Sequence, residues 1–134
     1  MRLILTALIF LAGMFDLFMG LSFLIDPAAT GAGAGFSIAA LNLTGTATIR
    51  ADMTAFFCVS ALCMMWGAWR RNADLLLVPA ALFGTAMVVR LFTAATMGTG
   101  PSWALPIAVE AFHFVLLIAA WRYLPHLKLE EIAG

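Results

Sequence analysis

Residues 75–97, LLLVPAALFGTAMVVRLFTAATM, and residues 106–123, PIAVEAFHFVLLIAAWRY, are two apolar runs joined by a short turn. At about 20 residues, each run is long enough to cross the hydrocarbon core of a bilayer as a helix. Helices joined by a short turn pack as antiparallel neighbours. The stretch therefore predicts a transmembrane helical hairpin, and the remainder of the chain can be interpreted from it.

Both runs contain ionisable side chains where ions are costly. Arg90 lies well inside the first run, and Glu110 and His113 lie inside the second. A charge near the bilayer centre costs about 3 kcal/mol on insertion scales, so such a residue usually faces a partner or a wet cavity. A helical rise of about 1.5 Å per residue puts Arg90 and Glu110 about 10 and 6 Å from the connecting turn. We therefore predict that they pair directly or through a water.

The whole chain is far more apolar than a soluble domain. Its 134 residues are 64% hydrophobic and 10% charged, with a mean hydropathy of +1.05, whereas soluble domains are about 25% charged. Two further apolar runs bring the expected spans to four, at about 3–25, 51–69, 75–97 and 106–123. The sequence thus predicts an all-α polytopic membrane protein, a four-transmembrane-helix antiparallel bundle that forms a single domain over residues 1–134.

The connection between the first two spans is rich in Gly, Ala and Thr. Asp26-Pro27 should end the first helix, because proline disfavours helical geometry in the residue before it. We expect residues 26–49 to form an extramembrane loop, with the second span entered through Arg50-Ala51-Asp52. Asp52 has two interpretations: a cap on the first free N–H groups of that helix, or a member of a functional polar site. The first apolar run is longer than the core of a signal peptide and contains an acid, so we interpret it as a span.

Several function classes receive no support from the sequence. Seven basic and seven acidic residues give no net charge, and the basic residues form no stripe, so nucleic acid is not an expected partner. Cys58 and Cys63 are five apart, a spacing typical of neither a redox pair nor a zinc knuckle. Glu110 and His113 fit the Glu-x-x-His spacing of di-iron bundles, but no second copy accompanies them. We expect no metal and no cofactor.

The first span contains an acid between two small residues. Gly13, Asp16 and Gly20 fall on one helical face, and glycines let a neighbouring helix approach closely. We therefore expect Asp16 to face the bundle, with local capping or snorkelling as the alternative. Because all four spans place an ionisable group in the same half of the bundle, we predict one shared polar chamber built from Asp16, Arg50, Asp52, Arg90, Glu110 and His113.

The basic residues near the ends of the spans predict the orientation. Most lie on one side of the membrane, and only Arg50 lies on the other: Arg2, Arg70, Arg71, Arg122 and Lys128 form the larger group. The excess of basic residues in short cytoplasmic loops then places both termini in the cytoplasm. We expect a multi-pass protein of the cell inner membrane whose polar chamber lies in the outer half.

A resemblance supports this interpretation. It rests on short motifs along nearly the whole chain: Asp26-Pro27, Ile49-Arg50-Ala51, Val89-Arg90-Leu91 followed by a glycine-containing turn, and Glu110 early in the last span. In these features the chain resembles a family of small bacterial four-helix integral membrane proteins grouped as a domain of unknown function. It departs from that family at Met53-Thr54-Ala55, where the family has an aromatic-Gly-Gly step. The resemblance implies a bacterial inner-membrane bundle and no activity, and the similarity to DoxX-like proteins is one of architecture.

Two functions from different classes remain open. The first is a binding or accessory protein whose chamber holds a small polar ligand or lipid headgroup, or docks onto a larger membrane complex. The second is an enzyme or carrier for a lipid or quinone-like substrate, with Glu110 or Asp16 as the carboxylate that handles a proton. In either case Arg90–Glu110 is open to a purely structural interpretation, since a buried ion pair can fix helix register. The lipid bilayer is an expected partner, and both a monomer and an oligomer are compatible with the sequence.

The predicted orientation can be tested by cysteine accessibility. A cysteine at position 33 should be labelled by an impermeant reagent from outside the cell, because residue 33 follows the first span. A cysteine at position 72 should be labelled only after the membrane is breached. The reverse pattern would place the termini on the outer side.

Overall fold

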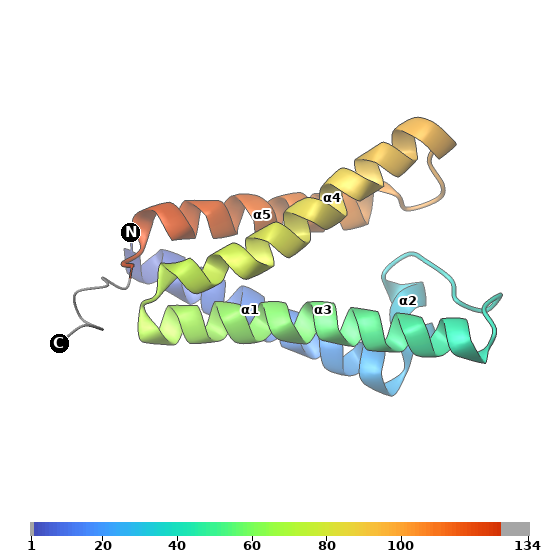
Figure 1. Ribbon diagram of the computed structural model, residues 1–134, viewed down its shortest axis with the longest axis horizontal. Coiled ribbons are helices and arrows are strands. Elements are labelled where there is room, and N and C mark those ends of the chain that lie inside the picture. Colours follow the sequence, from blue (N-terminus) through green and yellow to red (C-terminus); the bar gives the residue numbers. More distant parts are fainter. Residues whose placement is uncertain (1, 127–134) are drawn as a thin grey trace.

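The computed structural model describes residues 2–126 and is all-helical in this range. Four long helices alternate in direction, with two short helical segments between them: α1 (Arg2–Ile25), α2 (Pro27–Gly33), α3 (Leu43–Arg70), the 3-10 segment η1 (Ala73–Leu76), α4 (Leu77–Met97) and α5 (Ala104–Tyr123). The start of α1 and the end of α5 lie at the same end of the bundle (Figure 1).

Four helical stretches are long and apolar enough to cross a membrane: α1, α3, η1 with α4, and α5. The predicted fold class is confirmed, and the chain has the architecture of a multi-pass membrane protein. Lys128, which counted toward the predicted orientation, lies outside the described residues.

The helices α1 and α3 form a closely packed antiparallel pair. A Cβ at Gly13 would lie 3.2 Å from the carbonyl oxygen of Ala61, and one at Gly20 would lie 3.1 Å from the backbone nitrogen of Cys58 and 2.6 Å from its Sγ. Larger residues would push the two backbones apart, so the predicted close approach along this face is confirmed.

The connection between α1 and α3 contains more helix than its composition predicts. Asp26 ends α1 and also caps α2, because its Oδ1 accepts from the N–H groups of Ala28 and Ala29 at 3.1 and 3.0 Å. Pro27 follows at the first position of α2, where a missing N–H is tolerated. Phe36 then stacks on Phe23 of α1 at a centroid distance of 6.0 Å. Residues 26–36 are thereby folded back onto the end of α1.

The third helix begins at Leu43, well before the predicted start near residue 51. Its cap is Asn42, whose Oδ1 accepts from the N–H of Gly45 at 2.8 Å. The interpretation of Asp52 as a helix cap is therefore wrong: Asp52 lies inside α3 and is exposed. Composition suggested a loop because Gly and Thr are poor helix formers, and a well-placed cap outweighed that preference.

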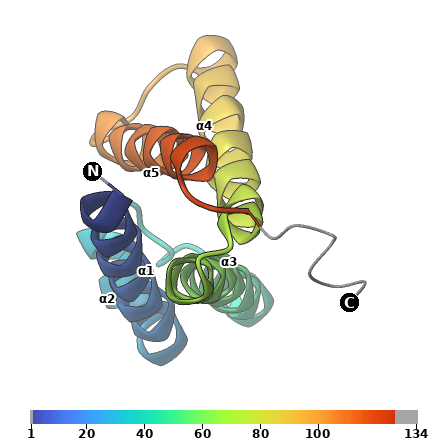
Figure 2. The same ribbon diagram turned by 90° about the vertical axis from the view of Figure 1, so that its left-hand side faces the viewer.

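The packed core lies toward the end of the bundle where α1 begins and α5 ends. Its buried apolar side chains include Ile9, Met64, Leu76, Phe83 and Leu117, one or more from each long helix. In α4 the buried residues are Pro79, Ala80 and Phe83, all in its first half. The second half of α4 diverges from α1 and α3 (Figures 1 and 2). The bundle is closed at one end and opens toward the α4–α5 turn, which comprises residues 98–103.

The α1–α3 contact makes a prediction about stability. Gly20→Ala should lower the thermal midpoint in detergent, because the added methyl group meets Cys58; overpacking of this kind costs about 1–3 kcal/mol. Gly33→Ala is the matched control, since nothing lies within 4 Å of a Cβ at that position. Thermal melts followed by circular dichroism should separate the two variants. An equal midpoint for both would contradict close packing at Gly20.

Candidate functional site

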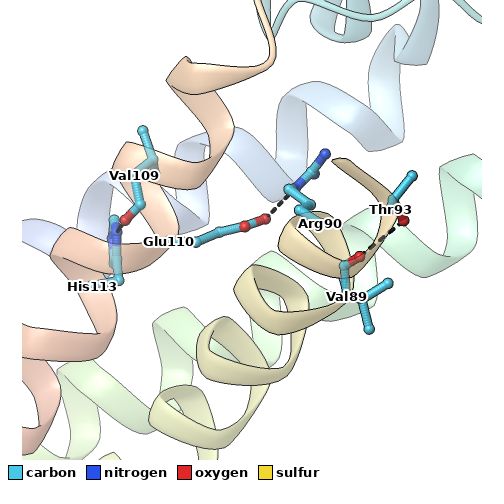
Figure 3. A network of polar contacts seen from close by, with 6 residues as sticks. All are labelled: Val89, Arg90, Thr93, Val109, Glu110 and His113. Atoms are coloured by element: carbon cyan, nitrogen blue, oxygen red, sulfur yellow. Dashed lines mark hydrogen bonds and ion pairs between the residues drawn. The ribbon is translucent and has the colours of Figure 1, made fainter. Parts of the chain in front are cut away.

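Arg90 of α4 and Glu110 of α5 form the ion pair that the sequence predicts. Arg90 Nε donates to Glu110 Oε1 at 2.6 Å, and the two side chains point toward each other across the helical hairpin (Figure 3). The Glu110 side chain is 8% exposed, whereas that of Arg90 is 44% exposed. The carboxylate is thus buried against its partner while half of the arginine remains accessible.

An open cleft of about 520 Å³ lies beside this pair. Residues of α4, α5 and the turn between them form its walls: Ala86, Val89, Arg90, Thr93, Ala94, Gly98, Thr99, Gly100, Trp103 and Ile107. Arg90 is the charged residue among them, and the Thr93 hydroxyl donates to the Val89 carbonyl of its own helix at 2.9 Å (Figure 3). The cleft therefore offers apolar walls around one guanidinium group.

Asp16 and His113 form a second polar pair in the interior. Asp16 on α1 is fully buried and His113 on α5 is 3% exposed. Asp16 Oδ1 lies 3.3 Å from His113 Nε2. The ring of His113 stacks on Phe83 of α4 at a centroid distance of 4.3 Å. The expectation that Asp16 faces the bundle is confirmed.

Ser60 on α3 was missed by the sequence analysis. Its side chain is fully buried, and its hydroxyl has no hydrogen-bond partner among the described residues. The contacts of Gly13 with Ala61 and of Gly20 with Cys58 set the register of the antiparallel pair, which puts Asp16 level with Ser60. A serine in the middle of an apolar run was the available signal.

The face on which Ser60 lies is fixed by its neighbour one turn away. Phe56 precedes Ser60 by four residues and so lies on the same face of α3. Phe56 packs edge-on against Phe83, which also stacks on His113. Ser60 therefore faces the interior in which the Asp16–His113 pair lies.

Arg50 and Asp52 do not join these pairs. Both are exposed on α3, and neither forms an ion pair within residues 2–126. Arg50 lines a different cleft of about 400 Å³ between α1 and α3, together with Leu24, Thr54 and Cys58. Instead of one chamber, the structure arranges the six predicted residues as two side-chain pairs, with Arg50 at a separate cleft and Asp52 exposed on α3. Side chains at equal depth on different helices need not point toward the same space.

Glu110 and His113, the two buried polar residues of α5, have different partners. Glu110 pairs with α4 and His113 with α1, although they are only three residues apart. The Glu-x-x-His spacing is thus used to contact two neighbouring helices.

A further polar group lies at the closed end of the bundle. Asp74 Oδ1 accepts from Trp121 Nε1 at 3.3 Å and lies 2.8 Å from His126 Nδ1. The backbone N–H of Ala73 donates to the carbonyl of Pro125 at 2.9 Å. These contacts join the start of η1 to the end of α5 and to the residues just after it. The sequence analysis did not find them because the partners are far apart in the chain.

Comparisons of the chain with known protein families, curated proteins and solved structures gave no match. The resemblance to the small bacterial four-helix family therefore stays a hypothesis. The features of the chain that bear on its function are the Arg90–Glu110 and Asp16–His113 pairs and the two clefts.

Arg90 and Glu110 differ in exposure, so substitutions at the two positions should differ in their effect on stability. Arg90→Gln removes the partner of a buried carboxylate and should be strongly destabilising, by about 3–5 kcal/mol if Glu110 stays charged. Glu110→Gln leaves a half-exposed arginine that reaches water, so its effect should be smaller. Unfolding titrations in mixed micelles can compare the two variants. The double variant Arg90→Glu with Glu110→Arg should recover part of the loss, and full additivity would contradict a direct pair.

Proposed function

We propose that the protein is an integral membrane binding or accessory protein that holds an amphiphilic ligand with an anionic head group in the α4–α5 cleft. The observation that carries this proposal is the half-exposed guanidinium of Arg90 in an otherwise uncharged cleft. In this proposal the ligand is a membrane lipid or a lipid-like molecule.

The geometry of Arg90 supports the proposal. A guanidinium group has five N–H donors, and the contact with Glu110 uses the one on Nε. The terminal nitrogens stay available on the accessible side. An arginine fixed in this way suits a phosphate or carboxylate, which it binds through two parallel hydrogen bonds.

The cleft walls suit the rest of such a ligand. Near Arg90 they are formed by Ala86, Val89 and Ile107, which give an acyl chain a smooth apolar surface. Trp103 closes the cleft in the α4–α5 turn and is about half exposed. Tryptophan favours the boundary between hydrocarbon and headgroups. The head group would then lie near Arg90 and the turn, with the chain along the two helices.

The proposed location follows the distribution of basic residues. With both termini in the cytoplasm of a bacterial cell, the open end of the bundle lies in the outer half of the inner membrane. The cleft is then accessible to lipids of the outer leaflet or to a partner on that side.

A second candidate is a carrier or enzyme for a lipid or quinone-like substrate. The observation in its favour is the buried carboxylate of Asp16, because ionisable groups inside membrane proteins often belong to substrate or proton pathways. Such a protein should lose turnover or transport in Asp16→Asn while ligand binding in the cleft is retained. A binding protein should lose ligand in an Arg90 variant and still bind it in Asp16→Asn.

Native mass spectrometry with defined lipids tests the leading proposal. The purified chain should retain phosphatidylglycerol over phosphatidylcholine, and Arg90→Lys should weaken that preference by about tenfold, as expected for one charge-assisted hydrogen bond. Arg50→Lys is the matched control, because Arg50 lines the other cleft. Equal retention of the two lipids, or an equal effect of both variants, would contradict the proposed site.

A further inference from the structure

We propose that Asp16 and His113 form a proton-binding site in the interior of the bundle, which holds one exchangeable proton between Asp16 Oδ1 and His113 Nε2 and is lined by Ser60. This site is separate from the α4–α5 cleft. It goes beyond the proposed ligand binding and does not rest on it.

The first step is the state of the imidazole ring. His113 Nδ1 lies 2.9 Å from the carbonyl oxygen of Val109, one turn earlier on α5 (Figure 3). A carbonyl oxygen only accepts hydrogen bonds, so Nδ1 must carry a hydrogen and donate it. This contact fixes the ring orientation, and Nε2 is left as the nitrogen that gains or loses a proton.

The second step is the count of charges. With one proton between Nε2 and Asp16 Oδ1, the pair is neutral overall, either as carboxylic acid with imidazole or as carboxylate with imidazolium. With no proton, an isolated carboxylate remains in a fully buried position, and with two, an isolated imidazolium. An unpaired buried ion costs several kcal/mol, so the state with one proton is favoured. Moving that proton from Nε2 to Oδ1 breaks one N–H bond, forms one O–H bond and leaves the net charge unchanged.

The third step concerns the groups that surround the pair. From α1 and α3 the polar groups are Asp16 itself and Ser60, which lie level with each other. Asp16 Oδ1 and His113 Nε2 lie 3.3 Å apart, outside hydrogen-bond geometry, and both are buried without a hydrogen-bond partner among the described residues. The same holds for Asp16 Oδ2 and Ser60 Oγ. From α4, Phe83 covers one face of the imidazole ring. A group able to donate or accept a proton therefore lies on the polar side of the pair, and an apolar ring shields the other side.

A further buried titratable group on the same helix is Glu110, one turn before His113 on α5. Its Oε1 is paired with Arg90, and its Oε2 is buried without a partner within residues 2–126. Arg90 in turn lines the open cleft. The Asp16–His113 pair therefore lies one turn of α5 away from the carboxylate that pairs with Arg90 at the cleft.

Nitrogen NMR of the full chain, with ¹⁵N-labelled histidine in lipid nanodiscs, tests the proposal. In His126→Gln, which removes the other histidine, Nδ1 of His113 should stay protonated at every pH where the bundle is folded. The ¹⁵N chemical shift of His113 Nε2 should be that of a ring nitrogen that shares a proton with a carboxyl group. This chemical shift should be lost in Asp16→Asn. A deprotonated Nδ1, or the same Nε2 signal with and without Asp16, would overturn the proposal.

A measurement that keeps Asp16 covers the case in which Asp16→Asn fails to fold. Infrared titration with ¹³C-labelled aspartate, in a chain that carries Asp26→Asn, Asp52→Asn and Asp74→Asn, reports the Asp16 carboxyl group, and the histidine signals report the ring. The two groups should hold one proton between them, so carboxylate and imidazolium should appear and disappear together. A carboxylate of Asp16 beside a neutral imidazole would contradict a shared proton.

Discussion

The burial of Asp16 is the constraint on which the other polar contacts depend. A carboxyl group buried in an apolar bundle needs a partner, and His113 is the group that reaches it. The close approach of α1 and α3 at Gly13 and Gly20 fixes the height of Asp16, and the Val109 carbonyl fixes the His113 ring. Helix α5 is thereby held against α1 on one side. Glu110, three residues earlier on α5, is free to contact α4 on the other.

Much of the fold could be predicted from the sequence, because long apolar runs have few alternatives in a membrane. The four spans and the Arg90–Glu110 pair follow from length and rise per residue alone. The start of α3 was misplaced because a single cap at Asn42 decided it against the local composition. The predicted chamber included too many residues. The sequence gives the depth of a side chain in the membrane but not the direction in which it points from its helix, and Arg50, at a depth compatible with the others, lines a different cleft. Ser60 was missed because only packing shows that its hydroxyl is buried.

The bundle has a packed end and an open end, and the proposed ligand site lies at the open one. Buried apolar side chains from all four long helices gather near Met64, Leu76 and Leu117, and the Asp74 contacts tie the connections together at that end. Beyond Phe83, α4 contributes no buried residue within the described chain. Few packed contacts mean low local stability, which is the property of elements that open and close around ligands. The cleft lies where the bundle can tolerate such movement without disturbing its core.

Glu110 connects the two halves of this arrangement. Its carboxylate is buried, so it depends on Arg90 for charge compensation. An anion in the cleft would compete for the same guanidinium group, because Arg90 is the charged residue that both can reach. Weakening of the Arg90–Glu110 contact would then change the field at His113, one turn along α5, since a low-dielectric interior screens little. A site that binds an anion and a pair that holds a proton would in this way be linked through a single side chain. The link requires no movement of the α1–α3 pair, whose glycine contacts keep Asp16 in place.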